Sequence, residues 1–139
     1  MRAPPAASSR LLAGIDLVEI AETQRSIERF GDRFLNRVFT ASELAVCQAT
    51  PSRQCERLAA RFAAKEATMK VLRLRDEGLS WRSIEVETSE GGWSELRLHG
   101  KAADLAAAAG ISDLSLSMSH SGGLATAVVI ATRDKAASP

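Results

Sequence analysis

The chain has 139 residues, a length typical of one domain that can bury an ordinary hydrophobic core. Its 18 basic and 17 acidic residues leave a formal net charge of +1, so no overall positive field marks a nucleic-acid-binding protein, although local basic patches remain open. No apolar run approaches the roughly 18 residues of a membrane span, and Cys47 and Cys55 lack the paired spacing of a zinc site. We therefore expect a cytoplasmic protein with reduced thiols and with neither nucleic acid nor membrane as a partner.

The two ends of the chain differ in composition from its middle. Residues 1–10 and 134–139 are small, polar and proline-bearing, which predicts flexible tails. The first ten residues also lack the apolar stretch of a signal peptide. We expect one folded domain over residues 11–133.

The first predicted strand carries a carboxylate. Residues 11–18 form a short apolar run interrupted by Asp16, which indicates a buried strand that ends near this residue. Residues 19–38 repeat apolar side chains at helical spacing and are predicted to form one amphipathic helix. Its polar face carries an arginine row, made up of Arg25, Arg29, Arg33 and Arg37.

Two further helices are expected next. Thr40 and Glu43 have the spacing of a capping box, which predicts the start of a short helix. Pro51 ends that helix. An alanine-rich, longer helix is predicted from Arg53 to about Leu74.

The second half of the chain is predicted to be mostly strands. Residues 83–88 and 95–98 alternate apolar and polar side chains on either side of a glycine pair, which favours a β-hairpin. A short helix is expected over 100–109, followed by strands over 113–119 and 124–132. The predicted fold class is α+β, with the long helix packed on a largely antiparallel sheet.

Glu66 and Lys70 on the long helix are the first candidate site residues. They stand one turn apart and share a helix face with Phe62. By itself, this spacing is typical of a solvated surface pair. If the face is buried, the two charges need a metal or an anionic substrate to compensate for lost hydration.

Asp16 and His120 also occupy positions where apolar residues are expected. Taken alone, Asp16 could cap the following helix, and His120 could be a turn histidine bonded to its neighbours. Two carboxylates without histidine or cysteine partners nevertheless suit Mg²⁺ completed by substrate phosphates, and a nearby lysine suits phosphoryl transfer. The turn that contains His120 adds hydroxyl donors for a further phosphate, from Ser117, Ser119 and Ser121.

Two spaced motifs resemble the signatures of the holo-acyl carrier protein synthases, which are small bacterial 4′-phosphopantetheinyl transferases. Residues 14–20 resemble the first signature, Gly-Ile-Asp with an aliphatic residue after it. Residues 62–70 resemble the second, Phe-x-x-Lys-Glu-Ala-x-x-Lys. Shorter matches follow in the family's order at Phe39-Thr40 with Glu43, Trp81 with residues 84–86, Leu98 with Gly100 and Ala102, and residues 117–121. The resemblance covers residues 14–131.

This resemblance implies a fold of the 4′-phosphopantetheinyl transferase type and a reaction. The 4′-phosphopantetheine arm of coenzyme A moves to a serine hydroxyl of an apo-acyl carrier protein, and adenosine 3′,5′-bisphosphate is released. By resemblance, Asp16 and Glu66 hold Mg²⁺, with Mn²⁺ as a substitute. Glu66 also helps to remove the serine proton, and Lys70 balances charge on the reacting phosphate.

The resemblance implies binding surfaces as well. Arg53, Ser119, His120 and Ser121 are similar to elements near the adenosine 3′-phosphate of coenzyme A, and Arg61 is placed where it could touch phosphate. Such enzymes form homotrimers with active sites between subunits. The arginine row resembles the surface that receives the acidic helix of a carrier protein, chiefly through Arg25, Arg29 and Arg33; the alternative is a solvated helix face.

Three positions depart from the family pattern. Ser94 stands where proline is common, and residues 72–79 replace a glycine-rich segment. Glu22 stands where a basic carrier-protein contact is frequent, which hints at a dedicated carrier, for instance of polyketide rather than fatty acid or lipid biosynthesis. Two other hypotheses stay open at this stage: a non-catalytic module of the same fold that binds coenzyme A or a carrier protein, and a structural α+β domain.

Overall fold

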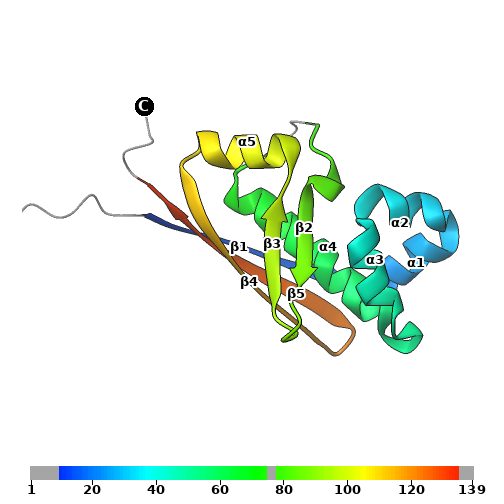
Figure 1. Ribbon diagram of the computed structural model, residues 1–139. Coiled ribbons are helices and arrows are strands. Elements are labelled where there is room, and N and C mark those ends of the chain that lie inside the picture. The colour runs from blue at the N-terminus through cyan, green and yellow to red at the C-terminus, as the bar shows by residue number, and fades with distance from the viewer. Residues whose placement is uncertain (1–9, 75–77, 135–139) are drawn as a thin grey trace, which may run out of the picture.

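The computed structural model describes residues 10–74 and 78–134 (Figure 1). Within these residues, a strand leads into a group of short helices, one long helix, a hairpin, a further short helix and two long strands. In chain order the elements are β1 (Arg10–Glu19), α1 (Ile20–Phe30), α2 (Asp32–Val38), α3 (Ala41–Gln48), the 3₁₀ turn η1 (Pro51–Arg53), α4 (Gln54–Val71), the 3₁₀ turn η2 (Trp81–Ser83), β2 (Ile84–Thr88), β3 (Ser94–Leu98), α5 (Gly100–Ala108), β4 (Ile111–Ser121) and β5 (Leu124–Arg133).

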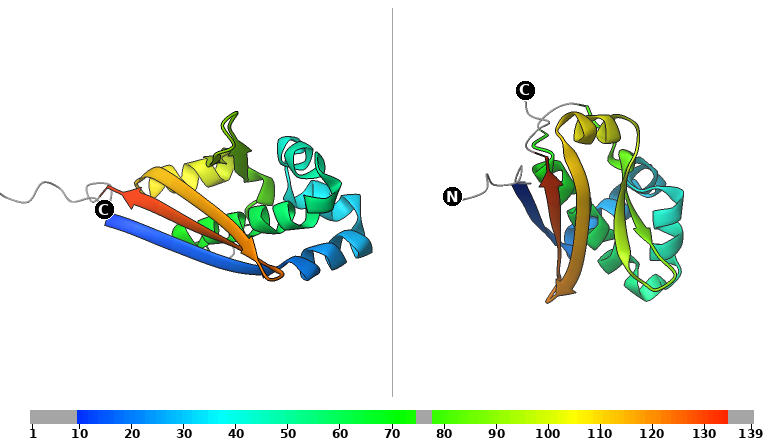
Figure 2. Two further views of the ribbon diagram at one scale, coloured as in Figure 1. Left: turned by 90° about the horizontal axis from the view of Figure 1, so that it is seen from below. Right: turned by 60° about the vertical axis from the view of Figure 1, so that its left-hand side comes forward.

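The strands form two separate antiparallel sheets. A three-stranded sheet has the order β1-β5-β4, and β2 pairs with β3 as a hairpin. Helix α4 lies between the three-stranded sheet and the hairpin, while α1, α2 and α3 gather at one end of the molecule (Figure 2). The predicted α+β class, with a long helix packed on an antiparallel sheet, is confirmed.

Small side chains allow α4 to approach the sheet closely. Ala63 and Ala67 of α4 are fully buried, and Ala127 and Val129 of β5 pack in the same clusters. Gly14 of β1 makes the nearest approach, because a Cβ atom there would overlap the carbonyl oxygen of Ala67 and crowd the side chain of Val71. The glycine of the first signature therefore serves packing, and it places the rest of β1 against α4.

The prediction of a buried strand that ends near Asp16 was wrong in two respects. Strand β1 continues to Glu19, and its residues alternate between buried and exposed. Leu11, Ile15 and Leu17 on the outer face are 69%, 61% and 61% exposed. The physical reason is that β1 is an edge strand whose inner face alone packs on α4, so an apolar sequence does not ensure burial on both sides.

The single helix predicted over residues 19–38 is divided in two. Gly31 adopts a φ of 55°, a conformation that favours glycine, and its N–H bonds the carbonyl oxygen of Ile27 at 2.8 Å to close α1. A new helix then starts at Asp32. The arginine row is therefore split, with Arg25 and Arg29 on α1 and the other two arginines on α2.

The remaining predicted elements agree with the structure within a few residues. The capping box is present, because the backbone N–H of Glu43 donates to Thr40 Oγ1 at 3.2 Å and the N–H of Thr40 donates to Glu43 Oε1 at 2.9 Å. The hairpin and α5 also form as expected. The departure from the family pattern predicted over residues 72–79 lies partly outside the described residues. The predicted tails lie almost entirely outside them.

Candidate active site

One face of α4 is less covered than the rest of the helix. From Leu58 to Val71, ten of the fourteen side chains are buried by their neighbours. We call the other four the open face of α4: Phe62, Glu66, Met69 and Lys70. Packing thus leaves accessible the same stripe that the sequence indicates.

Asp16 reaches this open face from β1. Its side chain is 14% exposed, and its Oδ1 lies 3.1 Å from Lys70 Nζ. Lys70 Nζ also donates to the carbonyl oxygen of Ile15 at 2.8 Å. The hydroxyl of Thr126 on β5 donates to the carbonyl oxygen of Asp16 at 2.8 Å, which fixes the strand on its other side. Lys70 therefore bridges α4 to β1, and its ion pair is with Asp16 rather than with Glu66 one turn away.

The pKa of the Glu66 carboxyl is shifted by these neighbours. Burial, and next the negative charge of Asp16, raise the pKa of Glu66, while the charge of Lys70 lowers it and offsets part of the rise. Two carboxylates and an ammonium thus converge beside the open face. A carboxylate with a raised pKa is a better proton acceptor than an ordinary glutamate, and two carboxylates together attract a cation.

The donor set can be tested for its fit to a metal ion. Among residues 10–74 and 78–134, no three histidine, cysteine, aspartate or glutamate side chains come together as a ready-made metal site. Asp16 and Glu66 can supply two oxygen ligands. Mg²⁺ commonly takes one or two protein carboxylates and completes its shell with water and substrate phosphates. The residues present fit that mode of binding, and not a closed site built from protein ligands alone.

His120 lies at a distance from the two carboxylates within one chain. It is exposed near the end of β4, and its Nε2 is 3.7 Å from Oε2 of Glu56. Because an α-helix rises 1.5 Å per residue, Glu56 and Glu66 lie roughly 15 Å apart along α4. Ser119 and Ser121 are exposed beside His120. A single chain therefore brings together Asp16, Glu66 and Lys70, but not these three with His120.

The two arginines predicted near phosphate differ in their surroundings. Arg53 is exposed in η1. Arg61 is only 5% exposed; its guanidinium donates to the carbonyl oxygen of Arg57 at 3.2 Å and to Thr88 Oγ1 at 3.1 Å. Within the described part of the chain, Arg61 has no carboxylate in ion-pair contact, and its Nε has no hydrogen-bond partner. A buried guanidinium without a neutralising acid is costly, so Arg61 has the character of an anion-binding group more than Arg53 does.

A buried ion pair went unrecognised in the sequence. Lys65 and Glu43 are fully buried, with Nζ and Oε1 2.8 Å apart. Burial lowers the pKa of Lys65, and the charge of Glu43 works in the opposite direction. The sequence did indicate that Lys65 is buried. It stands seven residues after Leu58 and seven before Leu72, which puts it on the same helix face as these two buried leucines. Its partner, 22 residues away, could not be found from that pattern.

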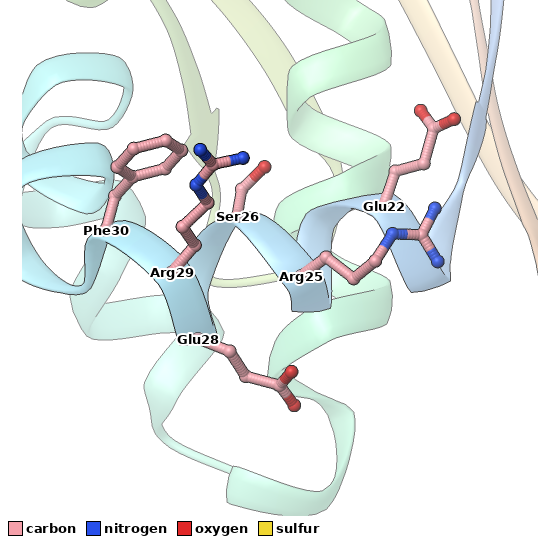
Figure 3. Close-up of a pocket in the computed structure, with 6 residues that line it drawn as sticks. All are labelled: Glu22, Arg25, Ser26, Glu28, Arg29 and Phe30. Carbon is pink, nitrogen blue, oxygen red and sulfur yellow. The ribbon is translucent and has the colours of Figure 1, made fainter.

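The surface of α1 combines cationic, acidic and aromatic groups (Figure 3). A shallow depression of about 690 Å³ is lined by Glu22, Arg25, Ser26, Glu28, Arg29 and Phe30. The guanidinium of Arg29 lies 5.1 Å from the centre of the Phe30 ring, whose side chain is 49% exposed. A second depression of about 270 Å³ lies beside it, between Phe30, Arg33, Phe34 and Arg37. The split arginine row therefore includes carboxylates and, next to Arg29, Arg33 and Arg37, an exposed aromatic side chain, so it is not a uniform basic patch.

No helix in the described part of the chain is both long and apolar enough to cross a membrane.

Comparison with known proteins assigns the family. The sequence model described as "4′-phosphopantetheinyl transferase superfamily" matches residues 13–129. A holo-[acyl-carrier-protein] synthase of Koribacter versatilis is 45% identical over 118 residues, which are 84% of this chain and 94% of the relative. Two solved structures with similar folds are complexes with coenzyme A.

The first, ACPS of Chronobacterium ammoniagenes bound to CoA, has a TM-score of 0.80 and 32% identity, and the match covers 91% of this chain and 98% of that one. The second, the holo-[acyl-carrier-protein] synthase of Helicobacter pylori in complex with coenzyme A, has a TM-score of 0.75 and 32% identity, with 86% and 99% covered. This chain therefore belongs to the 4′-phosphopantetheinyl transferase superfamily and, within it, to the holo-acyl carrier protein synthases.

Proposed function

We propose that this protein transfers the 4′-phosphopantetheine arm of coenzyme A to a serine hydroxyl of an apo-acyl carrier protein, with Mg²⁺ and with release of adenosine 3′,5′-bisphosphate. The observation that carries the proposal is the convergence of Asp16, Glu66 and Lys70 at the open face of α4. The names of the relatives support the class of reaction, and the two coenzyme A complexes support the donor.

Asp16 and Glu66 would hold the metal ion together with oxygens of the coenzyme A pyrophosphate. Bound there, Mg²⁺ supplies positive charge that stabilises the phosphate oxygens during transfer. Mn²⁺ fits the same two oxygen ligands. The chain's own contribution is to keep the two carboxylates close although they repel each other, which prepares the site for a cation.

Glu66 is the proposed proton acceptor. The serine Oγ of the carrier forms a bond to the phosphorus that bears the pantetheine arm, and its proton passes to the Glu66 carboxylate directly or through a water. The bond from that phosphorus to the bridging oxygen breaks, and the bisphosphate leaves with the electron pair. Partial burial of Glu66 favours this role, because it raises the pKa of the carboxyl toward the operating pH.

Lys70 is the proposed phosphate partner. Its side chain is 56% exposed and is held by Asp16 and the carbonyl oxygen of Ile15. An ammonium held in this way keeps its position without being sealed from solvent, so a substrate phosphate can join or replace the carboxylate as its partner. This charge compensation is the common strategy of phosphoryl-transfer sites.

The rest of coenzyme A would be held by a second set of residues: Arg53, Arg61, Ser119, His120 and Ser121. Because His120 lies roughly 15 Å along α4 from Glu66, one chain does not present both sets to one part of the cofactor. A site completed by a neighbouring subunit resolves this separation, so we include a homotrimer in the proposal. The exposed apolar side chains Leu11, Ile15 and Leu17 on the outer face of β1 support such an assembly.

The carrier protein would dock on α1 and α2. Arg25, Arg29 and Arg33 are exposed there, and Arg29 and Arg33 lie beside Phe30, which suits an acidic partner helix with an apolar residue among its charges. Whether that carrier serves fatty acid, lipid or polyketide synthesis stays a prediction, as does the cytoplasmic location.

The deciding experiment is a transfer assay. The purified protein is incubated with coenzyme A, Mg²⁺ and each of several apo-carrier proteins, and both the carrier mass and the bisphosphate are measured. We expect a mass gain on the carrier serine, equimolar bisphosphate, and loss of both with a chelator or with a serine-to-alanine carrier. A folded protein that modifies no carrier contradicts the proposal. Binding of coenzyme A without metal and without product would instead indicate a non-catalytic binding module.

A further inference from the structure

We propose that the buried Glu43–Lys65 ion pair is a positioning device that sets the rotation of α4, and with it the place of Glu66 beside Asp16. The inference rests on the proposed function for its catalytic consequence. Neither residue touches the open face of α4, so both act through the helix and not on substrate.

The hydrogen bonds around the pair use every proton of the lysine ammonium. Lys65 Nζ donates to Glu43 Oε1 at 2.8 Å, and also to the carbonyl oxygens of Trp81 and Ile84. An ammonium has three protons, and each has an acceptor. Glu43 is held equally firmly, since Oε1 accepts from the backbone of Thr40 and Oε2 accepts from the N–H of Val86 at 2.9 Å. One side chain of α4 is thus tied to α3, η2 and β2.

Stability alone does not account for two charges in this place. Both side chains are fully buried, and removal of two charges from water costs about as much as their attraction returns, so well-packed apolar residues of similar size are often as stable. A fully bonded ion pair does something that apolar contacts do not, because it fixes direction as well as distance. A fixed direction is what α4 needs, because Glu66, which follows Lys65 directly, has to point toward Asp16.

The order of residues along α4 shows what the pair controls. Successive helix residues point about 100° apart. Lys65 points toward α3 and β2, and the carbonyl oxygen of Ala67 lies against Gly14 of β1, where a Cβ atom would not fit. Glu66 stands between them. Rotation of α4 about its axis in either direction would pull Lys65 Nζ from its acceptors, and the close approach of Ala67 to Gly14 leaves no room for the helix to shift toward β1. The two contacts together set the direction of the Glu66 side chain.

The test uses a double variant, Glu43→Gln with Lys65→Met. It removes both charges, keeps the sizes of the side chains, and leaves an amide oxygen that can accept from Val86. The matched control is Glu85→Gln. Glu85 lies in a neighbouring polar network, with Ser42 Oγ at 2.8 Å and His99 Nε2 at 2.9 Å, and these hydrogen bonds join α3, β2 and the residue before α5. Its charge also acts on Lys65, so Glu85→Gln controls for the loss of a nearby charge with the Glu43–Lys65 bonds left in place. Folding of each variant is checked by circular dichroism and thermal melting before kinetics.

We expect kcat of the double variant to fall roughly 10- to 100-fold and the half-saturating Mg²⁺ concentration to rise by a similar factor, with KM for coenzyme A little changed. Glu85→Gln should lose stability without these changes. Wild-type kcat and Mg²⁺ requirement in the folded double variant would overturn the proposal. If the double variant does not fold, Lys65→Arg takes its place, because it keeps the charge but moves the donor atoms. Full activity in folded Lys65→Arg would then overturn the proposal.

Crystal structures of the wild type and the double variant separate this inference from the proposed function. We expect α4 to turn and the Glu66 carboxylate to leave its place beside Asp16. An unturned helix rejects the positioning role even if transfer is observed. A wild-type protein that transfers nothing rejects the proposed function, while the structural comparison still decides the role of the pair.

Discussion

Two lysines on α4 pair with carboxylates from other elements, and the two pairs differ in burial. Lys65 and Glu43 are both fully buried, whereas Lys70 and Asp16 are 56% and 14% exposed. The groups are chemically alike, and their helix positions are only five residues apart. The Glu43–Lys65 pair has fixed partners that no substrate can reach, while the Asp16–Lys70 pair can exchange a partner for a phosphate. Burial, and not the presence of an ion pair, separates a structural contact from a candidate site.

The largest effect on activity is expected from a change at Glu66, which lies between Lys65 and Lys70 in the sequence. Glu66→Gln removes a metal ligand and a proton acceptor while keeping the size of the side chain, so kcat should fall roughly 10³-fold. The melting temperature should stay close to that of the wild type, because the change also relieves repulsion with Asp16. Steady-state transfer assays and thermal melting measure the two quantities.

Glu56→Gln is the matched control for that experiment, because it makes the same change on the same helix next to His120. Normal turnover in Glu66→Gln would show that the open face of α4 is not where the chemistry occurs. An equal loss of kcat in Glu56→Gln would show that the effect is not specific to the carboxylate beside Asp16.

The two lysines allow a direct test of the comparison. Lys65→Met leaves the buried charge of Glu43 without an opposite charge beside it and should lower the free energy of unfolding by about 3–5 kcal/mol. Lys70→Met should change it by less than about 1 kcal/mol, because Lys70 is largely solvated, yet it should lower transfer activity strongly. Urea unfolding gives the first quantity and the transfer assay gives the second. Equal losses of stability in the two variants would remove the distinction between the pairs.

The response to acid should also differ between Glu85 on β2 and Glu66 on α4. Burial alone would raise the pKa of Glu85, but hydrogen bonds from Thr40, His99 and Ser42 outweigh it and lower this pKa to about 2 from an ordinary 4.5. A lowered carboxyl pKa gives stability that is present above the unfolded value and is lost as pH falls toward about 2. Because solvent screens part of these interactions, the loss should be only about 1–2 kcal/mol.

The pH dependence that Glu66 contributes to stability has the opposite sign, because the pKa of Glu66 is raised. Its contribution to stability is present at low pH and is lost as pH rises through the folded pKa, so acid does not remove the contribution of Glu66. Unfolding measured between pH 5 and about 2 should therefore show a flatter profile for Glu85→Gln than for the wild type. Parallel profiles would assign the acid sensitivity to other groups.

Local contacts account for the parts of the fold that the sequence predicted well. The capping box at Thr40 and Glu43 needs only residues three apart, and the pattern was sufficient to find it. The same Glu43 side chain also binds Lys65, 22 residues later, and nothing in the spacing of either residue indicates that partner. The capping-box motif thus predicted the local hydrogen bonds of Glu43 but not its ion pair with Lys65.

Other differences arise where burial or backbone conformation is decided by neighbours in space. The apolar run of β1 predicted a buried strand, but Ile15 and Leu17 face outward because side chains alternate along the strand and its inner face alone packs on α4. Gly31 divides a helix whose apolar spacing was otherwise continuous, through a φ of 55° that spacing does not encode. At the candidate site, the sequence indicated Asp16, Glu66 and Lys70 together, and the structure places them together; it does not bring His120 to them within one chain.

The smallest expected effect concerns the surface of α1, where charges are solvated on all sides. Arg29→Gln removes one cation beside Phe30 and should raise KM for the carrier protein roughly three- to tenfold, with KM for coenzyme A unchanged. Arg97→Gln is the control, because Arg97 is an exposed arginine on β3, away from α1, that pairs with Glu87 at the surface. The difference between the two variants should shrink as salt is raised, since exposed charges are screened within about 8 Å at physiological ionic strength. An equal effect of the two substitutions would indicate that the carrier senses the overall charge of the protein and not the arginines around Phe30.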